Sequence, residues 1–206
     1  MKAQRHTKKR KISNMTIIIL IILGVVLIGD IIGALIYLRQ SPQVQAELLN
    51  YLATGDSLSF WQIFWQQFLY QFTIWTMGLT IIGNFVNIFL VFMRGVSTGF
   101  NIALIVGEVS LGVLILWLVQ HLLIIFTTIL SAYFSLRFAY MVIKTVLVKK
   151  YNLLPKQFKL YATQLIVIMV LTMATAVISA ITAPLIPEQL TVPEVVGETY
   201  INGENR

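Results

Sequence analysis

The side chains that could carry chemistry in this chain are few and scattered. The sequence has two histidines, His6 and His121, and no cysteine, so it offers no thiol nucleophile, no disulfide framework and no cysteine metal site. The HExxH, GxSxG and P-loop patterns do not occur, and no pair of carboxylates is spaced for acid–base catalysis. We therefore expect a protein that is not an enzyme, with no catalytic residue, no metal site and no cofactor.

Isolated charges in apolar surroundings are the remaining candidates: Asp30, Arg94, Glu108 and Arg137. A charge within membrane hydrocarbon is costly and usually faces protein or water. One interpretation is a polar pathway or a binding site for another membrane protein. The other is structural: Arg137 reaches the membrane surface, Glu108 sits in a loop, and Arg94 pairs with Asp30 or Glu108 inside the bundle. We favour the structural interpretation.

Two further polar residues, Gln120 and His121, interrupt a long apolar block. They belong to the same set of intramembrane polar candidates. A single histidine without further metal ligands nearby is more typical of helix packing or hydrogen bonding than of metal binding, and we interpret His121 in that way.

Glycines four residues apart suggest where helices approach one another. Gly29 and Gly33 form one such pair, and Gly95 and Gly99 form another. Small residues one turn apart let two membrane helices come into backbone contact. The pattern predicts a tightly packed bundle or a homo-oligomer, without identifying the partner helix.

Composition and charge place these candidates in a membrane protein. Of the 206 residues, 58% are hydrophobic and 11% are charged, against about 25% charged in soluble domains. The net charge of +7 does not indicate nucleic acid, because most of the cations gather in two short segments without acids. These cations are Lys2, Arg5, Lys8, Lys9, Arg10 and Lys11 in the head, and Lys144, Lys149, Lys150, Lys156 and Lys159 later in the chain. Such segments are retained on the cytoplasmic side of a membrane.

The elements that position the candidates follow from hydropathy. We expect an all-α, polytopic helical membrane protein with about five transmembrane helices, the N-terminus inside and the C-terminus outside. It has a basic cytoplasmic head (1–14), a single transmembrane domain (15–186) and an extracytoplasmic tail (187–206). The spans lie near 15–38, 61–83, 85–107, 119–143 and 161–186, with residues 111–118 as a half-helix. An alternative places the second span at 66–92 and the third at 95–118. The first span is too long for a cleaved signal peptide.

Two loops complete this organisation, an external loop at 39–60 and a cytoplasmic loop at 144–160. Within the external loop, Ser41 and Pro42 predict the start of a helix. One face of that helix is apolar, with Val44, Leu48, Leu49 and Leu52 at helical spacing. Such a face binds lipid or a partner protein; a short solvated helix is the alternative.

Three passages together resemble the stage II sporulation protein M family: GDIIGA at 29–34, MGLTIIG at 77–83 continuing to FMRGVSTGF at 92–100, and VQHLLII at 119–125. The middle passage is the most specific, because a span punctuated by glycines is followed by a basic residue and then by two glycines four residues apart. The family tends to carry proline where this chain has Val119. The resemblance covers nearly the whole chain.

The resemblance implies a membrane scaffold in the bacterial cell membrane. Such a scaffold recruits or anchors peptidoglycan-degrading proteins, namely stage II sporulation proteins D and P, while a forespore is engulfed. Its expected partners are those proteins, membrane lipid and further copies of the chain, and not nucleic acid. The alternatives are a permease-like transport subunit and a family role outside sporulation.

Overall fold

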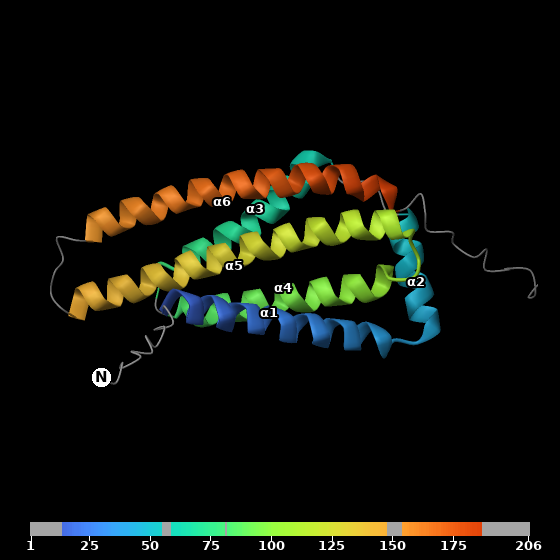
Figure 1. The fold of residues 1–206 in the computed structure, drawn as a ribbon, viewed down its shortest axis with the longest axis horizontal. Coiled ribbons are helices and arrows are strands. Elements are labelled where there is room, and N and C mark those ends of the chain that lie inside the picture. The colour runs from blue at the N-terminus through green and yellow to red at the C-terminus, as the bar shows by residue number, and fades with distance from the viewer. Residues whose placement is uncertain (1–13, 55–58, 81, 148–153, 187–206) are drawn as a thin grey trace, which may run out of the picture.

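Long helices lie side by side, and a shorter helix crosses one end of them (Figure 1). The computed structural model describes residues 14–54, 59–80, 82–147 and 154–186. The helices are, in chain order, α1 (Asn14–Leu38), α2 (Pro42–Thr54), α3 (Phe60–Met77), α4 (Gly83–Ile105), α5 (Leu111–Leu147), α6 (Leu154–Thr182) and the 3-10 helix η2 (Ala183–Leu185). No strand occurs in these ranges, so the predicted all-α fold is confirmed. Apart from Asn14, the predicted basic head and the predicted tail lie outside the described residues.

Successive long helices run in opposite directions along the bundle. α1, α4 and α6 run one way, and α3 and α5 run the other (Figure 1). α5 ends and α6 begins at the end that carries Lys144, Lys156 and Lys159, which we call the basic end. α2 lies across the opposite end. The alternation is compatible with an odd number of membrane crossings, while the count of five and the orientation remain predictions.

The chain reverses between α3 and α4, where the sequence left two placements open. α3 ends at Met77 and α4 begins at Gly83, so a single span over 66–92 is wrong, and the placement at 61–83 and 85–107 is close to the structure. A Cβ atom at Gly83 would lie closer than 3 Å to the Met77 carbonyl. The Gly83 N–H donates to the Thr80 hydroxyl at 2.9 Å. Glycine therefore lets the chain turn back tightly against the end of α3.

α5 differs most from the sequence-based expectation. Residues 111–118 are not a separate half-helix but the first turns of one helix that continues to Leu147. The reason is that the sequence after Gly112 contains neither proline nor glycine until well past the end of α5, so nothing breaks the helix. The predicted loop at 144–160 is correspondingly shorter, because α5 extends to Leu147 and α6 starts at Leu154. Residues 148–153 lie outside the described ranges.

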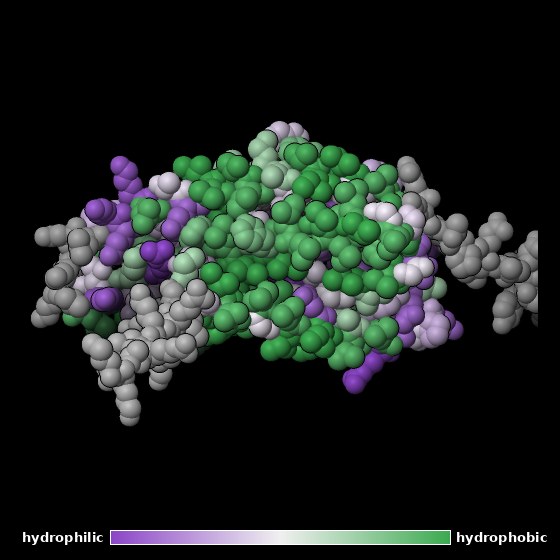
Figure 2. Space-filling view, in the orientation of Figure 1, coloured by the Kyte–Doolittle hydropathy of each residue, from purple (hydrophilic) through white to green (hydrophobic). Residues whose placement is uncertain are grey.

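Within the described ranges, four helices are long and apolar enough to cross a membrane: Met15–Leu38, Gly83–Ile105, Leu111–Leu147 and Leu154–Leu185. α3 is not among them, because glutamines alternate with its aromatic residues along 18 residues. It nevertheless packs within the same bundle against α5 and α6. Figure 2 shows a broad hydrophobic band between more hydrophilic ends. The chain is therefore a multi-pass helical membrane protein.

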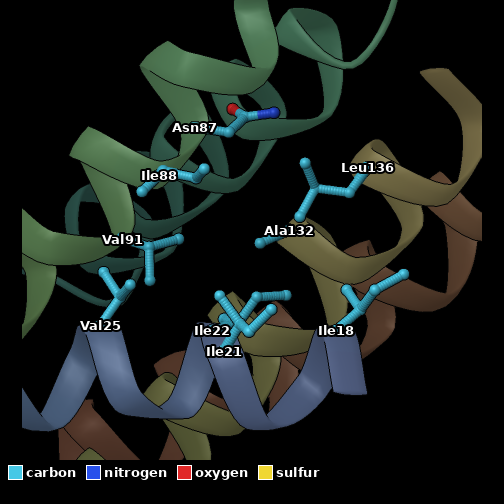
Figure 3. A pocket seen from close by; sticks show the side chains of 9 residues that line it. All are labelled: Ile18, Ile21, Ile22, Val25, Asn87, Ile88, Val91, Ala132 and Leu136. Atoms are coloured by element: carbon cyan, nitrogen blue, oxygen red, sulfur yellow. The ribbon is translucent and has the colours of Figure 1, made fainter. Parts of the chain in front are cut away.

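A groove opens between α1, α4 and α5, in the half of the bundle nearer the basic end (Figure 3). Its volume is about 210 Å³. Aliphatic side chains form its walls, among them Ile22, Ile88 and Leu136, and Asn87 is the one polar residue that lines it.

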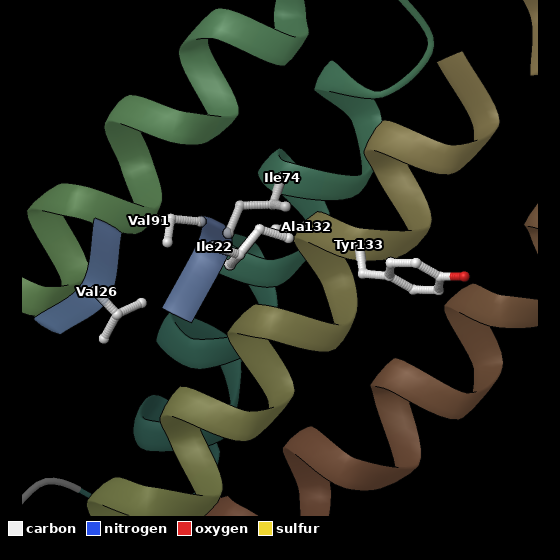
Figure 4. Close-up of a cluster of buried hydrophobic side chains, with 6 residues drawn as sticks. All are labelled: Ile22, Val26, Ile74, Val91, Ala132 and Tyr133. Carbon is white, nitrogen blue, oxygen red and sulfur yellow. The ribbon is translucent and has the colours of Figure 1, made fainter. Parts of the chain in front are cut away.

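The hydrophobic core lies where α1, α3, α4 and α5 meet. Figure 4 shows this cluster, which consists of Ile22, Val26, Ile74, Val91, Ala132 and Tyr133. A second cluster joins α3, α5 and α6 through stacked rings: Tyr161 lies 4.8 Å from Trp75 and 4.1 Å from Phe138 between ring centroids. The opposite face of α1 is exposed and apolar along its length, as expected of a helix that faces lipid.

Candidate functional site: the helix interfaces and their polar residues

The two glycine pairs face each other across the interface of α1 and α4. A Cβ atom at Gly29 would lie 2.5 Å from the Phe92 carbonyl oxygen and 3.0 Å from the Cα atom of Gly95. Cβ atoms at Gly33 and Gly99 would lie closer than 3 Å to backbone atoms of the other helix. The helices therefore touch backbone to backbone, a contact that only glycine allows. The partner helix that the sequence did not identify belongs to the same chain.

Arg94 and Asp30 lie near this interface without pairing. No ion pair joins Arg94 to Asp30 or Glu108 in the described part of the chain; the Arg94 guanidinium lies 5.2 Å from the centroid of the Tyr70 ring instead. Arg94 Nε and Asp30 Oδ1 are both buried without a hydrogen-bond partner. Successive residues of a helix differ by about 100° in direction. Since Gly95 faces α1, Arg94 is turned toward α3.

The remaining predicted charges lie away from the centre of the bundle. Glu108 is exposed in the turn after α4, and its N–H donates to the Ile105 carbonyl at 3.1 Å. Arg137 is exposed on α5, and its Nη1 donates to the Tyr133 hydroxyl at 3.4 Å. The structure thus does not bring the four charged candidates together into one site.

His121 makes its contacts within its own helix. Its Nδ1 lies 3.0 Å from the Trp117 carbonyl oxygen, and its ring lies 3.6 Å from the Trp117 ring between centroids. Among the residues that the structure describes, no group of three His, Cys, Asp or Glu side chains is placed to hold a metal ion. These contacts are those of a packing residue.

Gln120, in contrast, belongs to a polar network that joins α3, α5 and α6. Ser179 on α6 accepts from Gln120 at 2.8 Å and from Gln67 on α3 at 3.2 Å. The Thr175 hydroxyl donates to the side-chain oxygen Oε1 of Gln67 at 2.7 Å, and the Thr182 hydroxyl donates to Oε1 of Gln120. The network gives both side-chain amides hydrogen-bond partners inside the bundle. Membrane hydrocarbon contains no water that could serve as a partner instead.

Further polar contacts join α3, α4, α5 and α6 closer to the basic end. Gln71 Nε2 donates to the Thr128 hydroxyl at 3.0 Å, and Asn87 Nδ2 donates to the Ser135 hydroxyl at 2.5 Å. The Tyr161 hydroxyl donates to the Trp75 carbonyl at 2.5 Å, while Trp75 Nε1 donates to the Tyr161 carbonyl at 3.2 Å. The sequence pattern does not single out these residues. It does carry a signal for the Ser179 network, because serine and threonine recur every three or four residues along the last span: Thr172, Thr175, Ser179 and Thr182.

α2 has the predicted start but a different exposed face. The helix begins at Pro42, and the Val44 N–H donates to the Ser41 hydroxyl at 3.4 Å. The four apolar candidates do not form an exposed stripe. Val44 is 37% exposed, whereas the three leucines at 48, 49 and 52 are half-buried. The large exposed side chain of α2 is Tyr51, at 75%.

These features define a multi-pass helical membrane protein whose interior polar side chains bond within the bundle, some to each other across helices and many to backbone carbonyls. A family model described as Stage II sporulation protein M matches residues 13–184. The chain therefore belongs to the stage II sporulation protein M family. A search of curated proteins and a search of solved structures each found no match.

Proposed function

We propose that this protein is a non-enzymatic scaffold of the bacterial cell membrane that anchors peptidoglycan-degrading proteins during forespore engulfment. Family membership supports this proposal. The observation that carries it is the network centred on Ser179, in which side chains of three helices bond to one another. Side chains engaged in this way fix the helices relative to each other, which suits an anchor. They are not displayed toward a passing solute, as the permease-like alternative requires.

The proposed partners are proteins resembling stage II sporulation proteins D and P. Their docking place is the end of the bundle crossed by α2, which is the outer end in the predicted topology. Tyr51 and Val44 are exposed there, as is Trp61 at the start of α3. Exposed aromatic side chains at the edge of an apolar region are typical of membrane boundaries and of protein interfaces.

Recovery of the partners with purified protein from native membrane tests this proposal. Val44→Asp combined with Tyr51→Asp should lower recovery of the peptidoglycan-degrading protein several-fold. Phe158→Asp is the matched control, because Phe158 is also a large exposed hydrophobic side chain, at 50%, but lies toward the basic end. Equal loss in both variants, or no loss in either, would contradict docking at α2.

Reconstitution separates the scaffold from the transport alternative. Liposomes containing the protein should neither cleave peptidoglycan nor pass small solutes. A solute-specific flux that depends on the protein would replace the scaffold with a transport subunit.

Orientation is part of the proposal and has its own test. The chain has no cysteine, so single cysteines label without background. Tyr51→Cys in whole cells should react with an impermeant thiol reagent, and Leu147→Cys at the basic end should be protected. The reverse pattern would invert the topology and move the docking end to the cytoplasm.

A further inference from the structure

The groove between α1, α4 and α5 exists because the two glycine pairs occupy only one half of the α1–α4 interface. Toward the basic end, the same helices carry branched side chains, among them Ile22 on α1 and Ile88 and Val91 on α4. These side chains hold the backbones apart, and a space of about 210 Å³ remains. Ile21 and Ile88 are exposed at its edge, so the groove is open toward the membrane. An apolar cavity of about 150 Å³ already stays dry and takes up an apolar ligand.

Polar side chains continue the two walls of the groove toward the basic end. Asn84 lies three residues before Asn87, on the same face of α4, and its Oδ1 is buried without a hydrogen-bond partner. On α5, Tyr140 and Lys144 follow Leu136 at four and eight residues, and both are exposed. Helical spacing thus places an amide, a hydroxyl and a cation beyond the lined part of the groove, toward the basic end.

The charge at this end is of one sign among the described residues. The three acids in those ranges, Asp30, Glu47 and Glu108, lie in the second half of α1, in α2 and in the turn after α4. None of them is near the end of α5. Lysines without acids at the end of a membrane bundle attract anionic lipid headgroups.

From these observations we propose that the groove binds an anionic phospholipid. One acyl chain lies between Ile22, Ile88 and Leu136, and the phosphate lies near Lys144. The site is independent of the scaffold proposal, because it lies toward the end of the bundle opposite α2.

Native mass spectrometry of the purified full chain tests the lipid site. The protein is released from detergent that contains equal concentrations of dioleoylphosphatidylglycerol and dioleoylphosphatidylcholine, which have the same acyl chains. We expect the protein to retain phosphatidylglycerol over phosphatidylcholine by about fivefold, the factor that corresponds to ~1 kcal/mol for one cation near the headgroup. Equal retention of the two lipids overturns the proposal.

Variants locate the site. Lys144→Gln should abolish the preference, whereas Lys159→Gln, an exposed lysine on α6, should keep it. Ile21→Trp fills the groove and should lower retention of both lipids, whereas Leu27→Trp, at an exposed position of α1 outside the groove, should not. If Ile21→Trp does not fold, lipid retention is measured in Ile88→Phe instead, because that substitution fills the groove from α4. Wild-type retention in the groove-filling variant that folds, or equal loss in Lys144→Gln and Lys159→Gln, overturns the proposal.

Discussion

The α1–α4 interface and the α3–α5–α6 interface are held together by opposite means. Between α1 and α4, glycines bring the backbones into contact, and no side-chain hydrogen bond between these two helices is seen in the described residues. Between α3, α5 and α6, glutamine, serine and threonine side chains bond across the helices. In lipid, apolar burial gives helices little reason to associate, so close packing and interhelical hydrogen bonds remain as driving forces. This chain uses close packing between α1 and α4, and interhelical hydrogen bonds between α3, α5 and α6.

The two interfaces differ in the amino-acid substitutions that they tolerate. Backbone contact leaves no space for an added side chain, and neither helix can yield without moving as a whole. A hydrogen-bonded interface keeps its spacing when one polar group is removed, and loses only that group's bonds. The expected effects of substitution therefore decrease from the first interface to the second, and decrease further for residues that belong to neither.

The largest effect is expected for Gly99→Leu. Its side chain would collide with the backbone of Asp30, and overpacking against a rigid backbone should lower the free energy of unfolding by about 3 kcal/mol or more. Thermal unfolding in detergent measures this loss. Gly24→Leu is the control on α1, because a Cβ atom there meets nothing within 4 Å. A similar loss in both variants would show that the close contact at Gly99 is not the cause.

A smaller loss is expected for Ser179→Ala, which removes the acceptor shared by Gln67 and Gln120. Interhelical hydrogen bonds in membranes contribute about 0.6 to 1.7 kcal/mol each, so the free energy of unfolding should fall by about 1–2 kcal/mol. Thr163→Val on the same helix removes only a bond to the Lys159 carbonyl and should change little. A double-mutant cycle with Gln67→Leu should show coupling, and strictly additive losses would contradict the network.

Arg94→Met should raise the free energy of unfolding rather than lower it. An unpaired guanidinium costs about 2.5–3.5 kcal/mol at the centre of a membrane, and its contact with the Tyr70 ring offsets up to about 2 kcal/mol of this. We expect a net stabilisation of about 1 kcal/mol, measured as a higher unfolding temperature. Loss of stability that is rescued by Asp30→Asn would instead reveal an ion pair between Arg94 and Asp30.

The smallest effect is expected for His121→Phe. The histidine bonds only to its own helix and stacks on Trp117, and phenylalanine keeps the stacking. The free energy of unfolding should change by no more than about 0.5 kcal/mol. Purified protein analysed by thermal unfolding would test this, and a loss comparable with that of Ser179→Ala would mean that His121 is part of the polar network.

What the sequence predicts well is what depends on local pattern. The first and last spans, the start of α2 at Pro42 and the small-residue pairs all follow from hydropathy, capping or spacing. Averaged hydropathy carries no information on the direction in which a side chain points. For this reason the sequence predicts an acid beside Arg94, which is instead turned toward Tyr70, and it does not indicate that Ser179 faces inward. The sequence also does not predict the continuity of α5, because Gln120 and His121 resemble a break although they are bonded within the bundle.

The length of α5 has a mechanical consequence. At about 1.5 Å per residue, its 37 residues extend for about 55 Å, well beyond the ~30 Å of membrane hydrocarbon. At the basic end, the Thr145 and Gln157 side chains bond to each other at 3.1 Å and tie α5 to the start of α6. Because α5 is unbroken over this length and bonded to α6, we expect the two helices to tilt together as one rigid unit. A displacement at the basic end would then also displace the opposite end of the bundle, beside α2.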